Sequence, residues 1–221
     1  MKYIIAVLAF VLVLAEPGYP QSVNWRSLRP DQRHLIQLDL GYSYGATAQF
    51  GYGYRLTLVR PAMVGIDYSF PMGERLLDDF KVRLGAQIEI VEVGGFSATA
   101  RILASLRRFE NPLVRIVGFG SDFGLVAGYY DPAWHVAGEL GFDKAITSHV
   151  EHSDVMRTSF PAARDGWYIP TGGNWYYGLQ AGKTIGESYD LSVRMGATDA
   201  QGSDEDAVLA YYLQLGLGMR F

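Results

Sequence analysis

The chain has 221 residues and a formal net charge of −4 at pH 7, with 49% hydrophobic and 19% charged residues. A chain of this length can bury a sizeable core as one domain. The acidic balance argues against a broad basic surface, so we expect no nucleic-acid partner. Because the sequence has no cysteine, disulfides and thiolate metal sites are excluded.

The N-terminus has the pattern of an export signal. Met1 and Lys2 provide a short positive region, and residues 3–14 form an apolar stretch. This stretch is shorter than the roughly twenty residues that a transmembrane helix needs, although a membrane-anchoring helix is the alternative interpretation. Residues 13–15 match the site that signal peptidase cleaves, so we predict cleavage after Ala15, with a cut nearer Gln21 as the second choice.

Most of the remaining chain alternates between apolar and polar side chains with a period of two, which predicts β-strands. In the sixth run the parity changes between Ile116 and Phe119, which predicts a bulge near Val117 and Gly118. Eight strands is the closest alternative to our count of ten. The ten predicted strands lie at 36–44, 48–56, 64–70, 80–90, 96–107, 114–129, 134–143, 175–185, 189–198 and 209–221.

The last run places a large apolar side chain at every odd position and ends the chain on an aromatic residue. It resembles the C-terminal strand of bacterial outer-membrane β-barrel proteins, in which such alternation and a terminal Phe form the assembly signal. The residues that match this signal are Tyr211, Leu213, Leu215, Leu217, Met219 and Phe221. The resemblance implies an all-β fold, an up-and-down antiparallel transmembrane barrel. It also implies a cell outer membrane location, with membrane lipid and the barrel-assembly machinery as partners.

This assignment divides the chain into a signal peptide (1–15), a periplasmic N-terminal segment (16–33) and an outer-membrane β-barrel (34–221). Connections after even-numbered runs are short and those after odd-numbered runs are longer on average, as expected for periplasmic turns and outer loops. Aromatic residues near strand ends of the apolar face fit interfacial girdles. They are Tyr42, Tyr44, Tyr68, Phe70, Trp134, Trp175, Tyr177 and Phe221.

A soluble sandwich or lipocalin-like barrel is the competing fold, because amphipathic strands would also suit a periplasmic binding protein. The face with the charged residues is also the face with most of the glycines, which favours a crowded polar lumen. The charged residues predicted to form a network there are Asp39, Arg55, Asp67, Lys81, Arg83, Glu89, Arg101, Arg107, Glu139, Asp143, Arg194 and Arg220. Two interpretations stay open: a salt-bridged plug that stiffens the barrel, and a narrow, slightly anion-favouring pore.

Some small outer-membrane barrels are enzymes, and two loops carry candidate groups. Asp78 and Asp79 with the pairs Ser148-His149 and His152-Ser153 allow a protease or deacylase interpretation, but their spacing matches no motif. The same stretch, with Glu151 and Asp154, offers possible metal ligands without a defined coordination geometry. His135 is expected to hydrogen-bond to a lumen acid. We therefore predict no catalytic residue, no metal and no cofactor.

Residues 148–174 form the best candidate for a specific activity, because they are too long for a passive connection and contain aromatic residues and prolines. Residues 22–33 are interpreted as a lumen plug, a segment on the inner leaflet or a disordered leader. Three functions remain open. They are a structural or small-solute pore role, a binding or accessory subunit of an envelope complex that acts through the 148–174 loop, and a lipid- or peptide-cleaving enzyme.

Overall fold

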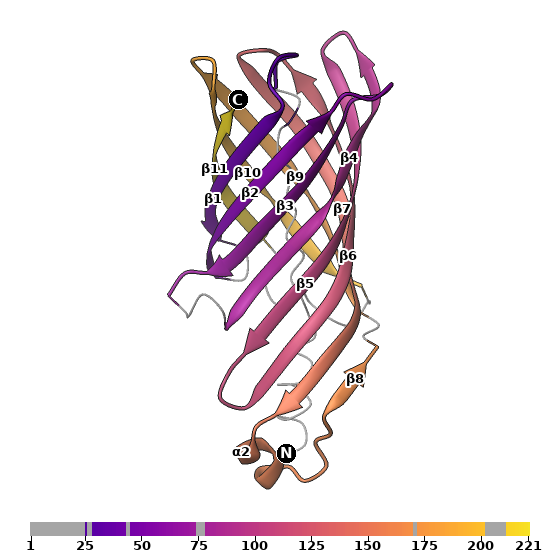
Figure 1. The fold of residues 1–221 in the computed structure, drawn as a ribbon, viewed down its shortest axis with the longest axis vertical. Helices are drawn as coiled ribbons and strands as arrows, with labels where there is room; N and C mark the ends of the chain where they lie inside the picture. Colours follow the sequence, from indigo (N-terminus) through magenta and orange to yellow (C-terminus); the bar gives the residue numbers. More distant parts are fainter. Residues whose placement is uncertain (1–24, 26–27, 43–44, 74–77, 170–171, 202–210) are drawn as a thin grey trace.

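The computed structural model describes residues 25, 28–42, 45–73, 78–169, 172–201 and 211–221 (Figure 1). Ten of its strands form a closed antiparallel barrel, as predicted. The predicted signal peptide at 1–15 lies outside the described residues, as does Tyr44. The barrel strands are β1 (His34–Tyr42), β2 (Ala46–Leu56), β3 (Ala62–Pro71), β4 (Asp79–Val93), β5 (Phe96–Glu110), β6 (Val114–Tyr130), β7 (Trp134–His152), β9 (Gly173–Ile185), β10 (Tyr189–Ala200) and β11 (Tyr211–Arg220).

The barrel closes between its first and last strands. β1 pairs with β11 in the register that places Leu38 opposite Leu217, and each other barrel strand pairs with its two neighbours. Closure removes free strand edges, so the backbone polar groups of the wall can all pair within the sheet, as hydrocarbon surroundings require.

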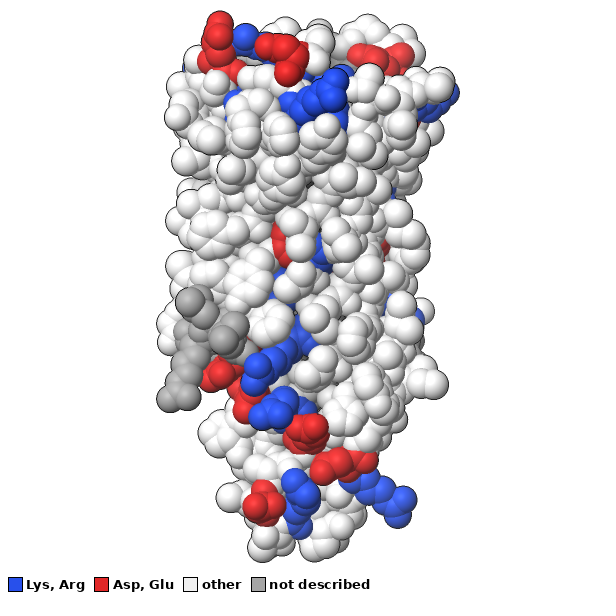
Figure 2. All heavy atoms as spheres, viewed as in Figure 1, with Lys and Arg blue, Asp and Glu red and all other residues white. Residues whose placement is uncertain are grey.

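The two faces of the wall differ as the alternation predicts. On β11, Leu213, Leu215 and Leu217 are 49, 62 and 45% exposed, whereas Gln214 between them is buried. Figure 2 shows the result on one face of the molecule, where a broad, mainly uncharged band separates two charged ends. In the part of the chain that the structure describes, no helix is long and apolar enough to cross a membrane.

The connections at one end of the barrel are all short, whereas the other end carries the longest connection together with short ones such as 111–113 (Figure 1). The short turns are 57–61, 94–95, 131–133 and 186–188, and the longest connection, 153–172, lies at the other end. Gly94 and Gly95 have φ of 57° and 85°, which makes glycine the natural choice for this tight turn. In the outer-membrane barrels that the sequence resembles, the short turns are periplasmic, so we expect this end to face the periplasm.

The predicted bulge in the sixth run is wrong. β6 keeps its parity throughout, and Ile116 faces inward opposite Val150 of β7, which is fully buried. The irregularity lies on β7, where the partners change from Phe119–Thr147 to Gly120–Ala145 and leave Ile146 over. The apolar pair Ile116 and Val150 faces inward near the outer end of the wall. In the sequence, the apolar residues therefore change parity although the strand itself does not. A second bulge, at Ile90 of β4, was not predicted.

Much of residues 148–169 also forms regular secondary structure and not an open loop. β7 continues to His152, α2 (Asp154–Ser159) follows, and β8 (Gly166–Tyr168) returns along β7 opposite residues 148–150. Ser153 caps α2, because its Oγ accepts a hydrogen bond from Met156 N. We call residues 148–169 the extracellular extension; it forms the lower tip of the molecule in Figure 1.

Candidate functional site: a polar belt in the lumen

Each barrel strand contributes one buried polar side chain to a ring on the inner wall, which we call the lumen belt. Its members differ in charge, and all are at most 7% exposed. They are Asp39, Gln49, Asp67, Arg83, Arg101, Asp122, Glu139, Tyr176, Arg194 and Tyr212, from β1, β2, β3, β4, β5, β6, β7, β9, β10 and β11 respectively.

Arg83 organises the part of the belt on β1 to β4. Its Nε donates to Asp67 Oδ1 at 2.9 Å, and its Nη2 donates to Gln49 Oε1 at 3.3 Å. Gln49 Nε2 in turn donates to Asp39 Oδ2 at 3.5 Å. Since Arg83 is fully buried, these contacts replace the water that an isolated guanidinium would require.

Asp122 joins this part of the belt to the strands beyond it. Its Oδ2 lies 3.9 Å from Arg83 Nη1, and its Oδ1 lies 3.5 Å from Arg101 Nε. Tyr176 of β9 donates from its hydroxyl to Asp122 Oδ1 at 2.8 Å and accepts from Arg101 Nη2. Two guanidinium groups and one phenol therefore surround a single buried carboxylate.

Glu139 is the centre of the remaining part. Arg194 of β10 donates to it through Nε, at 2.7 Å, and through Nη2, in a two-pronged geometry. Tyr212 of β11 donates from its hydroxyl to Glu139 Oε1 at 2.6 Å. Arg194 also donates from Nη1 to Gln214 Oε1 at 3.3 Å, so four side chains form one cluster.

Glycines make room for these contacts along the wall. A Cβ added to Gly141 would overlap the hydroxyl of Tyr176, and one added to Gly178 would overlap the hydroxyl of Tyr212. The two tyrosines therefore lie against the inner wall across neighbouring strands. The long side chains of the belt are held around the circumference of the barrel.

A small cavity lies beside Asp39 and Arg194. Its volume is about 10 Å³, room for roughly one water molecule. Gln37, Gln180, Ser192 and other polar groups line it, so a water there would find hydrogen-bond partners.

Comparison with known proteins agrees with the fold. No family model and no curated protein matches the chain. An outer membrane channel from Pseudomonas putida F1 superposes with a TM-score of 0.55 and 10% identity, covering 91% of this chain and 100% of that one. The chain therefore has the fold of a small outer-membrane β-barrel. A KdgM porin in complex with disordered oligogalacturonate is also similar, with a TM-score of 0.45 and 9% identity over 85% of this chain and 99% of the porin.

The other charged residues predicted for the lumen of the barrel lie above and below the belt. Lys81 and Asp143 form a buried ion pair between β4 and β7, and Arg107 Nε lies 3.7 Å from Asp79 Oδ1. Toward the periplasm, Glu89 Oε2 accepts from Ser97 Oγ at 3.0 Å, Arg220 Nη2 donates to Tyr189 O at 3.3 Å, and Arg55 donates to two backbone carbonyls of the N-terminal segment.

Sequence reasoning missed three buried carboxylates of the lumen: Asp79, Asp122 and Asp190. Asp122 has inward parity but was obscured by the supposed bulge, and Asp79 was assigned to an outer loop. These three acids offset the excess of basic groups in the predicted network, which removes the basis for an anion preference. The belt tyrosines were also missed, although the glycines opposite them were a usable signal.

The residues considered for catalysis or metal binding are divided between faces. His149 and Glu151 point outward on β7, whereas His152 is buried and its Nδ1 lies 2.8 Å from Asp165 Oδ1. Hydrogen bonds from the His152 backbone and ring hold the pKa of Asp165 below its ordinary value. A groove of about 360 Å³ lies beside these residues at the extracellular tip. Among the described residues, no cluster of His, Asp and Glu could hold a metal ion.

The predicted aromatic girdle lies on the outer face. Tyr42, Trp134, Trp175, Tyr177 and Phe221 are all exposed, as side chains at a lipid interface would be. Tyr68 and Phe70 are half-buried because their rings contact each other, with centroids 5.7 Å apart, and pack against neighbouring rings. His135, expected to bond to a lumen acid, is buried and stacks on Tyr130 with ring centroids 5.7 Å apart.

Proposed function

We propose that this protein is a narrow channel for small polar solutes and that the lumen belt is its constriction. The observation that carries the proposal is the belt itself, to which every barrel strand contributes a polar side chain that is tied along the wall. A barrel that only needed a filled interior could use apolar packing. A polar inner wall instead gives hydrated solutes hydrogen-bond partners along their path.

The size of the barrel supports a narrow lumen that admits only small solutes. Barrels of about eight to ten strands have interiors close to the size that side chains can fill, in contrast to the wide porins of sixteen or more strands. The belt adds long side chains at the same level, and its small cavity offers room for about one water molecule. We therefore expect passage of ions and small polar molecules and exclusion of larger sugars.

Liposome swelling tests this expectation. Purified protein in liposomes should admit glycine and other small polar solutes quickly, and the rate should fall steeply toward the trisaccharide raffinose. Liposomes that contain boiled protein are the control, because they hold the same chain without a folded barrel. Entry of every solute at the control rate, in the unaltered chain and in a chain with Arg55 changed to alanine at the periplasmic rim, would refute the channel.

A second function, as a binding or accessory subunit, is favoured by the tip of the extracellular extension. Val155, Trp167 and Ile169 are 64, 62 and 83% exposed there. Exposed apolar side chains beyond the lipid band suit contact with another envelope protein. Affinity purification from native membranes should then recover a partner that is lost when Trp167 and Ile169 are changed to serine. Identical recovery with both chains would argue against this role.

We also propose that residues 211–221 are the signal read by the barrel-assembly machinery. Phe221 supports this role because its carbonyl accepts from His34 N at 2.8 Å and its ring stacks on the ring of His34, so the last residue joins the two strands that close the barrel. Phe221→Ala should lower the amount of heat-modifiable barrel in the outer membrane, whereas Val59→Ala in an exposed turn should not. Equal amounts of barrel for both variants would contradict the proposal.

A further inference from the structure

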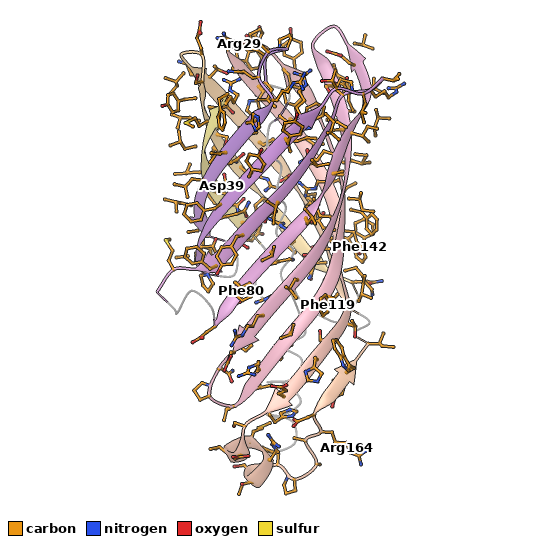
Figure 3. The ribbon with its side chains drawn as sticks, viewed as in Figure 1. Arg29, Asp39, Phe80, Phe119, Phe142 and Arg164 are labelled. Atoms are coloured by element: carbon orange, nitrogen blue, oxygen red, sulfur yellow. The ribbon has the colours of Figure 1, made fainter. Side chains whose placement is uncertain are left out.

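The described residues before β1 contact the rim of the barrel in two places at the end with the short turns. The carbonyl of Arg29 accepts from Arg55 Nη1, at the end of β2, at 3.2 Å. The guanidinium of the same residue pairs with Glu187, in the turn between β9 and β10, at 3.3 Å. In the sheet, β1 and β11 separate β2 from β10. Arg29 thus connects two separate parts of the rim (labelled in Figure 3).

Further polar contacts hold this segment in place. Arg55 Nη1 also donates to Leu28 O at 3.1 Å, and Gln32 Nε2 donates to Glu187 O at 3.2 Å. Gln32 is buried, and its Oε1 accepts from Arg29 N at 3.1 Å. Each side of the rim therefore holds the segment through more than one atom.

An apolar seat inside the barrel receives the segment. Trp25 and Leu28 form a cluster with the wall residues Leu35 and Met63, and all four side chains are at most 5% exposed. Leu35 and Met63 are inward-facing and apolar on a wall that is otherwise mainly polar inside. Gly53 keeps the space for Met63, because a Cβ there would overlap its sulfur. The wall is shaped to bury these two side chains of the segment.

We propose that residues 25 and 28–33 form a strap that closes the periplasmic mouth of the channel, and that release of the strap opens it. This inference rests on the proposed channel function. The strap is suited to release because, among its described residues, only Arg33 is hydrogen-bonded backbone to backbone with the barrel: its N donates to Phe221 O, and its O accepts from Arg55 N at 2.8 Å. Its ion pair is solvent-exposed, and exposed pairs hold weakly. Burial of Trp25 and Leu28 provides most of the attachment.

A pair of alanine substitutions tests the strap. Trp25→Ala with Leu28→Ala removes the buried contacts and should raise the rate of glycine entry into liposomes several-fold over wild type. The matched control is Leu58→Ala with Val59→Ala, two exposed apolar residues in a turn at the same end, and it should leave the rate unchanged. A gel-mobility check before each assay shows that the barrel has folded.

A second release variant leaves both apolar side chains of the strap unchanged, and a labelling measurement reports on the exposure of the strap itself. Arg55→Ala removes the two carbonyl contacts and should also raise the rate of glycine entry. Because the chain has no cysteine, Leu28→Cys provides a single thiol on the strap itself. This thiol should react slowly with a membrane-impermeant maleimide, and several-fold faster when Arg55→Ala is added.

The outcomes separate the strap from the channel. Faster entry in both release variants supports the strap. Entry at the wild-type rate in both, with rapid labelling of Leu28→Cys in the otherwise unchanged chain, overturns it while the channel stands. No entry above boiled-protein liposomes in any variant overturns the channel function and the strap with it.

Discussion

Replacing Arg194 with methionine should lower the free energy of unfolding more than removal of the other donor to Glu139, the hydroxyl of Tyr212. The Glu139 side chain is fully buried and accepts two hydrogen bonds from Arg194 and one from Tyr212. Methionine keeps much of the arginine volume but supplies no donor. Removing one partner of a buried ion pair costs about 3–5 kcal/mol. Tyr212→Phe removes one hydrogen bond to the charged group, for about 1.5–3 kcal/mol.

The double variant Arg194→Met with Glu139→Gln shows whether the pair acts as a unit. Because it removes the charge that Arg194 neutralises, its cost should be smaller than the sum of the single changes, by about 0.5–3 kcal/mol. Guanidinium titration of the protein in lipid vesicles, followed by tryptophan fluorescence, gives the free energy of unfolding for each chain. Two results would contradict a coupled cluster around Glu139. One is a smaller loss of unfolding free energy for Arg194→Met than for Tyr212→Phe, and the other is additivity of the single changes Arg194→Met and Glu139→Gln.

Two further predictions concern the wall and the extension. Gly182→Ala places a Cβ on the buried ring of His135 and should cost about 1–3 kcal/mol of unfolding free energy, largely recovered when His135→Ala is added; no recovery would contradict the overlap. The pKa of Asp165 is lowered in the folded chain, so its stabilising effect is present above its ordinary pKa and is lost as pH falls through the folded value. Limited proteolysis of the extension should therefore be slow and constant near neutral pH and faster in acid. The Asp165→Asn variant should be cut faster than wild type at neutral pH. The control variant Asp154→Asn should be cut at the wild-type rate. A wild-type cleavage rate for Asp165→Asn would show that the contact with His152 does not hold the extension.

The wall of the barrel was predictable because lipid imposes a simple rule. Every second side chain from Tyr211 to Phe221 faces hydrocarbon, so a period of two persists in the sequence, and the inward positions follow from it. The same rule placed Asp67, Arg83 and Arg194 on the inner face. These assignments need only the parity of one strand at a time.

The rule fails where the wall leaves the lipid. At the outer end of β6 and β7, Ile116 and Val150 face inward, and His149 and Glu151 face outward. Without hydrocarbon outside, polarity no longer reports the direction of a side chain. For this reason the predicted end of β7 came too early, and the bulge at Ile146 was assigned to the wrong strand.

The connections within the belt could not be predicted from strand parity. Tyr212 reaches Glu139 across β10 and β9, and the contact depends on barrel closure and on the glycine at 178 beneath the ring. Partner identities of this kind combine the register of several strands with the conformations of long side chains. The glycines were visible in the sequence, but the tyrosines that cover them were identified only in the folded wall.

The reversal potential of single channels tests most directly whether solutes pass along the belt. Asp39 accepts hydrogen bonds from the neutral amides of Gln37 and Gln49, so Asp39→Asn removes a lumen charge with little change in shape. Under a potassium chloride gradient, this variant should shift the reversal potential toward chloride selectivity. Asp154→Asn, the same change at a fully exposed side chain in the first turn of α2, should not. An unchanged reversal potential for Asp39→Asn would contradict a conducting path along the belt.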